Sequence, residues 1–286
     1  MKDGYTSSLK RQRIFRTVVC VIFCILALGP FLLLIMNATR SSEAIKSGIS
    51  LIPSGHLIEN WKNLLAKQNG MQITLQKAAL NSLTITVPGT FLAVYFSSMT
   101  AYGIYVYDFK FKKFAWAFIM AIMMVPSQIS IIGFYRFMLD LKLVDTYIPL
   151  IIPAIAAPAV VFYMRQYMKS SFPLDIVEAA RIDGSGEFRT FLTIAIPMCK
   201  PAIAVQAIFA FVQNWNNFYT QNMIIVSNEK KFTMPIMIQS VLGQDKHPDL
   251  GAQYAAVALS VIPIIIIYLI LSRFIVAGVA LGGVKE

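Results

Sequence analysis

Charged residues are scarce in this chain. Only 14% of its 286 residues are Asp, Glu, Lys or Arg, whereas 57% are hydrophobic. A soluble domain normally carries about a quarter charged residues. The mean hydropathy of +0.65 agrees with this imbalance. The shortage of charge therefore excludes an ordinary soluble globular domain.

Histidine and cysteine are also rare. His56 and His247 are far apart in the sequence, and no set of His, Cys and carboxylate residues has the spacing of a zinc site. Cys20 and Cys24 share a helix face within an apolar run, and Cys199 is expected in a reducing compartment, so no disulfide framework is predicted. A metal site and a redox centre are both unexpected here.

Motifs of common enzymes are missing. The chain has no Gly-x-Ser-x-Gly elbow. Its C-terminal "GVALGGVKE" lacks the Gly-Lys-Ser/Thr ending that lets a phosphate loop bind nucleotide. We therefore expect no enzyme and no cofactor in this chain, and any nucleotide hydrolysis would come from another chain.

Nucleic-acid signatures are absent despite a net charge of +11. No arginine-rich tract is interleaved with aromatic residues, and no nucleic-acid recognition motif occurs. Three segments beside apolar runs are rich in basic residues: Lys10, Arg11, Arg13 and Arg16; Lys110, Lys112 and Lys113; and Lys169, Arg181, Arg189 and Lys200. The other connections carry bases too, such as Arg40 and Lys230, but these are mixed with acids such as Glu43 and Glu229. Under the positive-inside rule the three basic segments face the cytoplasm. The pattern predicts that both chain termini are cytoplasmic.

Long uncharged runs are what the chain has in abundance. A helix needs roughly 20 apolar residues to cross the hydrocarbon core, and its backbone groups must pair internally. Six blocks meet this length: 17–39, 78–107, 114–135, 146–164, 201–227 and 250–272. The sequence predicts an all-α integral membrane protein with six transmembrane helices.

The first block is longer than the apolar core of a signal peptide, which has about 7–15 residues. We therefore expect it to be a retained span. Residues 1–16 then form a cytoplasmic N-terminal tail, and residues 17–286 form the six-span domain.

None of the six blocks contains an Asp, Glu, Lys, Arg or His residue. Carriers that relay protons normally bury at least one ionisable group within the membrane. The absence argues against a carboxylate-coupled carrier, although sodium coupling through backbone carbonyls stays open.

The fifth block is rich in amides, in the stretch "FVQNWNNFYTQN". In a continuous helix Gln213, Asn217 and Thr220 share one face, because they are spaced i, i+4, i+7. Together with Asn214 and Tyr219 they are candidates for a path that contacts sugar hydroxyls. Hydrogen bonding between helices is an equally good explanation of these amides. The small and hydroxylated residues of the second block, Asn81 and Ser82 among them, favour helix packing.

A polar segment, residues 174–201, interrupts the apolar blocks and contains "EAARIDGSGEFRTFLTIAIPMCKP". The pattern predicts a short helix at 174–182, a turn at Asp183-Gly184-Ser185-Gly186 and a second helix at 187–196. Such a helix–turn–helix is too small to form its own core. It could be a simple connection, or an element that docks on a partner.

This segment resembles the EAA loop of binding-protein-dependent ABC importers. The matching positions are Glu178, Ala179, Ala180, Asp183, Gly184, Ile194, Pro197 and Pro201. Further segments, from "NSL" at 81–83 to "WNNFYT" and the closing "GVALGGVKE", extend the resemblance over about residues 81–286. The chain is similar to the MalG-like permease subunits of carbohydrate ABC importers. It departs from their pattern at Asn216, where Asp or Glu is common, and at Glu286, where Gly is usual.

The resemblance implies that the first short helix is a coupling helix seated on a cytoplasmic ATPase. Glu178 would face a basic group of the ATPase, Ala179 and Ala180 would allow close approach, and Gly184 would make the turn. Arg181 and Asp183 belong to the same coupling surface.

It also implies the partners and the location. These are a second homologous permease, two copies of an ATPase that binds ATP and Mg²⁺, an extracytoplasmic sugar-binding protein, and the lipid of a bacterial plasma (inner) membrane. The function implied is ATP-driven import of a sugar, and the class favours oligosaccharides. The alternatives are a stand-alone secondary sugar carrier or channel, and a membrane scaffold without a substrate.

Overall fold

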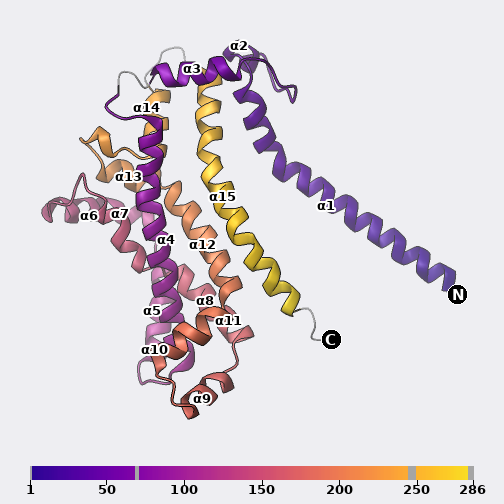
Figure 1. Ribbon diagram of the computed structural model, residues 1–286, viewed down its shortest axis with the longest axis vertical. Coiled ribbons are helices and arrows are strands. Elements are labelled where there is room, and N and C mark those ends of the chain that lie inside the picture. Colours follow the sequence, from indigo (N-terminus) through magenta and orange to yellow (C-terminus); the bar gives the residue numbers. More distant parts are fainter. Residues whose placement is uncertain (1, 68–70, 244–248, 283–286) are drawn as a thin grey trace. The chain divides into compact units, whose positions relative to one another are not determined.

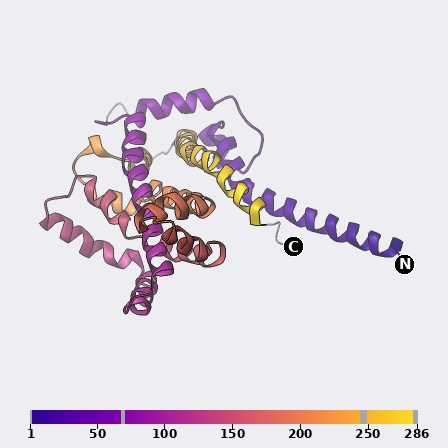
Figure 2. The ribbon, with the colours of Figure 1, turned by 60° about the horizontal axis from the view of Figure 1, so that its bottom comes forward.

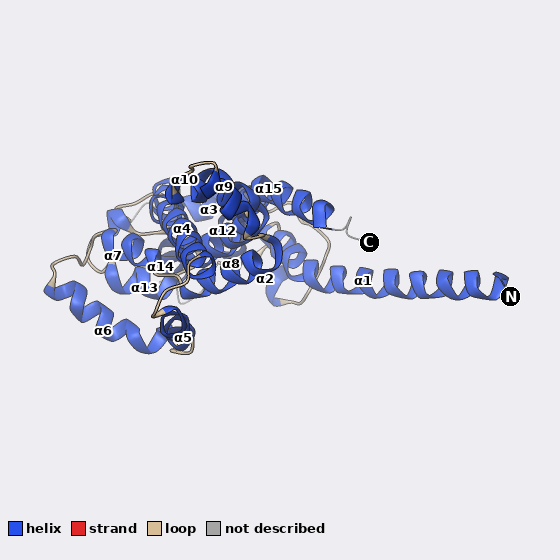
Figure 3. Ribbon diagram, turned by 90° about the horizontal axis from the view of Figure 1, so that it is seen from below, coloured by secondary structure: helices blue, strands red, loops and turns tan. Residues whose placement is uncertain are grey.

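The structure is a computed structural model that describes residues 2–67, 71–243 and 249–282. Every regular element in these described ranges is a helix, and they contain no strand (Figure 3). The prediction of an all-α protein is therefore confirmed. The chain divides into two compact units, Met1–Gly70 with Ser240–Leu259, and Met71–Gln239 with Ser260–Glu286.

The first unit has one very long helix and two short ones. They are α1 (Lys2–Ala38), α2 (Ser42–Lys46) and α3 (Leu57–Lys67). The start of α15 (Leu250–Gly282) also belongs to this unit. Asp249 accepts hydrogen bonds from Ser42 Oγ at 3.0 Å and Asn63 Nδ2 at 2.9 Å. It thereby fastens the beginning of α15 to α2 and α3. Because α1 begins at Lys2, residues 2–16 of the predicted tail and the first span lie in one continuous helix.

The second unit is built along α4 (Leu75–Val106). Helices α8 (Pro158–Ser171) and α12 (Lys200–Trp215) pack against α4 (Figures 1 and 2). Shorter elements of this unit include α7 (Ile148–Ile151), η2 (Ile152–Ile155), α9 (Asp175–Ile182), α10 (Glu187–Thr190), η3 (Phe191–Ala195), α11 (Ile196–Met198), η4 (Glu229–Lys231) and the first part of α14 (Met234–Gly243).

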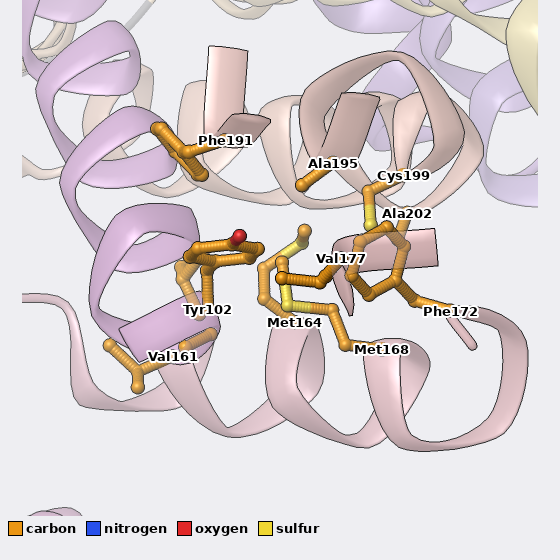
Figure 4. Packing of buried hydrophobic residues seen from close by; sticks show 12 residues of the cluster. Tyr102, Val161, Met164, Met168, Phe172, Val177, Phe191, Ala195, Cys199 and Ala202 are labelled. Carbon is orange, nitrogen blue, oxygen red and sulfur yellow. The ribbon is translucent and has the colours of Figure 1, made fainter. Parts of the chain in front are cut away.

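An apolar core closes one end of the second unit. Tyr102 of α4, Met164 and Met168 of α8, Val177 of α9 and Phe191 of η3 meet there, each at most 2% exposed (Figure 4). Burying a side chain of this size stabilises the fold by about 1.5–3 kcal/mol. This core therefore anchors the polar segment to the helices that carry the apolar blocks.

Three predicted blocks are interrupted. Residues 146–164 fall in α7, η2 and α8, which together still form one candidate span, Ile148–Ser171. For the other two blocks the prediction of one continuous helix is wrong. Residues 114–135 fall in α5 (Lys112–Met123) and α6 (Ser127–Asp140), with Pro126 directly before α6. Residues 201–227 fall in α12 and α13 (Phe218–Ile224), separated at Asn216 and Asn217. Proline has no N–H and disfavours a helical residue before it, which explains the first break.

Four helices of the described residues are long and apolar enough to cross a membrane: Lys10–Ala38, Leu75–Val106, Ile148–Ser171 and Leu250–Ile275. A fifth crossing results if Glu187–Met198 and Lys200–Trp215, bent by 81°, are counted together. Helices α5 and α6 have only 12 and 14 residues, so neither half of the third block reaches the required length alone. The predicted number of six is therefore not reached by these criteria.

Candidate functional site

The polar segment forms the predicted helix–turn–helix. Helix α9 ends at Ile182, Asp183 is its C-cap, and Gly184 follows with a φ of +76°. The Gly184 N–H donates to Arg181 O at 3.0 Å, and the Ser185 N–H donates to Ala180 O at 2.9 Å. This pair of bonds is a Schellman motif, whose left-handed position glycine fills without strain. The Asp-Gly turn signal therefore marks the end of α9.

Helix α9 has a buried and an exposed side. Val177 and Ala180 are buried, at 1% and 6% exposure, whereas Glu178 and Ala179 are exposed. Ile182 is 87% exposed, which is unusual for a large apolar side chain. Of the two alanines of the motif, only Ala179 lies on the outer surface, and Ala180 packs within this chain. Glu178 makes no ion pair within the described residues.

A hollow of about 450 Å³ lies between α9 and the segment that follows it. It is lined by Ile176, Ala179, Ala180, Asp183, Gly184, Ser185, Arg189, Thr193 and Ile194. Four of the six predicted coupling residues, Ala179, Ala180, Asp183 and Gly184, therefore border one concave surface.

Arg181 pairs with Glu187 across the turn. Arg181 Nε donates to Glu187 Oε1 at 2.7 Å, and the hydroxyl of Tyr107 donates to Glu187 Oε2 at 2.7 Å. The hydrogen bonds from Arg181 and Tyr107 lower the pKa of the Glu187 carboxyl below its ordinary value. Burial, together with the neighbouring carboxylate, raises the pKa of Tyr107 to about 12. The carboxylate is therefore charged and the phenol protonated at neutral pH.

A second candidate site is a cavity of about 150 Å³ among α4, α6, α7, η2 and the region of the α12–α13 break. It is lined by Ile85, Phe134, Pro149, Leu150, Pro153, Ala154, Asn214, Asn217, Thr220 and Gln221. None of these lining residues, which all lie in the described part of the second unit, is charged. The cavity offers amide and hydroxyl groups on one side and apolar carbon on the other.

Three of the five predicted pathway residues line this cavity, namely Asn214, Asn217 and Thr220. Gln213 and Tyr219 do not line it, and both are exposed, Tyr219 at 76%. The predicted i, i+4, i+7 stripe assumed one continuous helix. The break at Asn216 and Asn217 turns α13 out of that register, so Gln213 and Thr220 no longer share a face.

The break itself is held by polar contacts. Asn217 caps α13, since its Oδ1 accepts from Thr220 N at 3.3 Å. Buried Gln221 donates from Nε2 to Asn214 O at 2.9 Å and accepts from Thr233 Oγ1 at 2.5 Å. The amides therefore satisfy backbone groups that the interrupted helix leaves free.

Polar residues of α4 fix the segment that follows α13. Asn81 Nδ2 donates to the carbonyls of Lys230 and Phe232, both at 2.9 Å. Ser82 Oγ accepts from Met234 N at 2.8 Å. The interpretation of these α4 residues as packing groups agrees with these contacts.

Asp145 is a functional candidate that the motif analysis missed. Its carboxylate accepts from the backbone N–H groups of Val226 and Ser227, at 2.8 and 3.1 Å, and from Ser227 Oγ at 2.5 Å. Lys231 Nζ donates to the Asp145 carbonyl at 2.6 Å. These contacts clamp the α6–α7 loop onto the chain after α13. The only signal in the sequence was the acid itself, Asp145, within the stretch "LKLVDTY" at residues 141–147.

Burial raises the pKa of Asp145, but the hydrogen bonds from Ser227, Val226 and Asn228 outweigh it and lower the pKa below its ordinary value. The clamp is therefore made by a carboxylate. In the described residues no group of three or more His, Cys, Asp or Glu side chains could hold a metal ion.

Helices suited to a bilayer, a protruding helix–turn–helix and an uncharged polar cavity together define a membrane transport subunit. The family described as "Binding-protein-dependent transport system inner membrane component" matches residues 93–281. The chain belongs to this family, so it is a permease subunit of an importer and not itself an enzyme. The resemblance noted in the sequence is thereby confirmed.

Similar proteins include the arabinooligosaccharide transport permease AraQ of Halalkalibacterium halodurans, 34% identical over 94% of this chain and 95% of the relative. AraQ of Bacillus subtilis is 32% identical over 96% of both chains. The melibiose/raffinose/stachyose import permease MelC of Bacillus subtilis is 27% identical over 96% of this chain and 98% of its own length.

A solved structure has the same fold. It is a bacterial ABC transporter involved in importing the acidic polysaccharide alginate, with a TM-score of 0.72 and 21% sequence identity. The alignment covers 91% of this chain and 95% of the other. At this identity the likeness establishes the fold alone.

Proposed function

We propose that this chain is one of two permease subunits of an ATP-driven importer that moves an oligosaccharide delivered by an extracytoplasmic binding protein. The observation that carries the proposal is α9, a short helix anchored by buried Val177 with Glu178 and Ile182 exposed. Such a helix suits docking into a groove of a cytoplasmic ATPase. ATP and Mg²⁺ would be bound by two copies of that ATPase.

The proposed topology has six crossings with both termini in the cytoplasm of a bacterial cell. Helices α5 and α6 would make the third crossing together, and α12 with α13 would make the fifth. Broken helices are tolerated in a membrane where other protein covers the break. The EAA loop at 174–201 would then face the cytoplasm, together with the basic segments around it.

The cavity supports a neutral sugar as substrate. Its lining of Asn214, Asn217, Thr220 and Gln221 supplies uncharged donors and acceptors, whereas a phosphorylated substrate would call for a positive group. AraQ and MelC are named for neutral oligosaccharides. Ligand pockets usually measure roughly 300–1,000 Å³, so the cavity of about 150 Å³ would be one part of a path completed by the second permease.

Uptake in the organism that encodes the chain tests this function. Deletion of the gene is expected to abolish uptake of labelled arabinotriose or raffinose, and the wild-type gene is expected to restore it. In the deletion strain, the Glu178→Lys and Gly184→Asp variants are expected to be expressed at the normal level but not to restore uptake. Unchanged oligosaccharide uptake after deletion would refute the proposed function.

A further inference from the structure

Helix α9 is fastened to the second unit in two different ways. On its inner side Val177 packs into the apolar core, beside Phe172 (Figure 4). On its outer side Arg181 joins a polar link with Glu187 and Tyr107. The apolar contacts hold the helix on the protein, whereas directional hydrogen bonds can fix its orientation.

One carboxylate connects three segments in this link. Glu187 begins α10, Arg181 lies in the last turn of α9, and Tyr107 directly follows α4. Besides the two bonds of 2.7 Å, Arg181 Nη2 donates to Glu187 Oε2 at 3.3 Å. The guanidinium carbon also lies 5.8 Å from the centroid of the Tyr107 ring. The arginine is thus held by a two-pronged ion pair and by an aromatic face.

Tyr107 is itself tied to the end of α4. Its backbone N–H donates to Gly103 O at 3.2 Å, and Lys112 Nζ donates to its carbonyl at 2.8 Å. The link therefore reaches from α9 to the backbone of α4 and does not end at a free side chain.

The link contributes little to overall stability, because the side chains of Arg181 and Glu187 are 41% and 45% exposed. Exposed ion pairs are screened by solvent and rarely stabilise a fold measurably. Two side chains that converge on the Glu187 carboxylate with good geometry instead restrict the angle between α9 and α4. The contact therefore fixes the orientation of α9 relative to α4.

We propose that Tyr107, Arg181 and Glu187 are positioning residues that make α9 and the end of α4 move as one rigid body. Further along α4, Ile85 lines the polar cavity, so a movement applied to α9 would reach the cavity wall through one continuous helix. In Figure 1 α9 lies near one end of α4, and α13, which also borders the cavity, lies nearer the other end. The inference rests on the proposed function, because an ATPase must supply the movement.

Pulsed electron resonance between two spin labels measures this rigidity directly. Asp108, just after α4, and Asp175, the first residue of α9, are both exposed and can be replaced by labelled cysteines. Exposed Cys20 and Cys24 are changed to alanine, and buried Cys199 stays. The distance distribution is recorded in the full complex without nucleotide, with ATP, and with ATP and vanadate. The same complexes are assayed for sugar uptake per ATP hydrolysed.

The parent labelled chain is expected to give one narrow distribution in all three states. Glu187→Gln, Arg181→Glu and Tyr107→Phe are expected to broaden it and to lower uptake per ATP by roughly threefold to tenfold. The swap of Arg181→Glu with Glu187→Arg reverses the ion pair, and the Tyr107 hydroxyl, which donates to Glu187 in the wild type, can instead accept from the guanidinium at position 187. The swap is therefore expected to restore both readouts, which a general folding defect would not allow. Lys169→Glu, the same charge change at an exposed residue of α8, is the matched control.

A narrow distribution and normal coupling in all three single variants would overturn the inference. A swap that folds but stays as broad as the single variants would also overturn it. Failure of the proposed function is distinguishable, since no ATPase would then copurify with the wild type. The width of the distribution in the isolated chain would still report whether the link holds α9 to α4.

Discussion

At the scale of single residues, two of the four described residues with positive φ, Gly184 and Asp145, lie in the loop contacts described above. Gly184 has a φ of +76° and Asp145 a φ of +59°. Glycine takes this conformation freely, and Asp and Asn take it more readily than other residues. Gly184 ends α9, and Asp145 places its carboxylate on the chain after α13. The left-handed backbone alone therefore accounts for a glycine at position 184 and an aspartate at position 145, independently of any role in transport.

Substitutions of Gly184 separate strain from charge. A Cβ at Gly184 would meet no atom within 4 Å. The Gly184→Ala substitution therefore lowers stability only through the left-handed backbone conformation, by about 1–2 kcal/mol. We expect Gly184→Asn to keep most uptake and Gly184→Ala to lose more of it. Limited proteolysis of the 174–201 loop gives an independent measure. Faster cleavage in the asparagine variant than in the alanine variant would contradict this account.

Asp145→Asn removes the charge but keeps the shape and the tolerance for left-handed backbone. The amide has a single acceptor oxygen for the donors of Val226, Ser227 and Asn228, and its NH₂ group opposes them. An unpaired donor costs about 1–3 kcal/mol, so a lower midpoint of thermal unfolding is expected. Asp140→Asn, an exposed acid of α6, is the control and should leave the midpoint unchanged.

The pH dependence of this clamp follows from the lowered pKa of Asp145. A carboxyl whose pKa falls on folding contributes stability above its unfolded pKa of about 3.9, and that stability disappears as the pH falls through the lower, folded value. The wild type should therefore lose this contribution only below about pH 4. The difference in unfolding midpoint between wild type and Asp145→Asn should stay constant from about pH 5 to pH 8. A difference that vanishes near neutral pH would contradict the assignment.

At the scale of elements, the informative features are the breaks in the apolar helices. Block length and hydropathy located every long helix, because they report how a segment partitions into lipid. They could not locate the interruptions after Met123 and Trp215, since a broken helix is stable only where other segments satisfy its free backbone groups. At the second break Gln221 and Asn217 do this, and that depends on tertiary placement.

The same limit applies to the candidate sites. The short helices of the EAA loop were predictable from local turn and capping signals, and α9 starts and ends within one residue of the expected range. The cavity was predictable only for Asn214, Asn217 and Thr220, whereas Pro149 and Ala154 come from a segment distant in sequence. The outward positions of Gln213 and Tyr219 could not be foreseen, because they follow from the break.

Asn217 tests the role of the second break. Asn217→Ala removes the side-chain cap of α13, at a cost of about 1 kcal/mol, and also removes a polar group from the cavity. Asn217→Ser keeps a capping oxygen but shortens the side chain. We expect Ala to lower both the unfolding midpoint and uptake, and Ser to lower uptake alone. Equal loss of stability in the Ala and Ser variants would contradict the role of Asn217 as a cap. The control is Asn222→Ala, at an exposed residue of α13, which should change neither the unfolding midpoint nor uptake.

At the scale of the whole molecule, the second unit has polar contacts near both ends of α4. Near its start Asn81 and Ser82 hold the segment after α13, and beyond its end Tyr107 bonds to Glu187 beside α9. The proposed importer needs such a connection, because ATP is hydrolysed on a partner and the sugar crosses elsewhere. Helix α4 is the element whose contacts reach both candidate sites.

The central claim is that α9 docks on an ATPase, and copurification tests it most directly. The chain is tagged in its native host, extracted in mild detergent and compared with Glu178→Lys and with the control Asp140→Lys. We predict that an ATPase subunit is recovered with the wild type and the control, and is lost with Glu178→Lys. Recovery of the wild-type chain alone, still transporting sugar after reconstitution, would contradict the account and identify a stand-alone carrier.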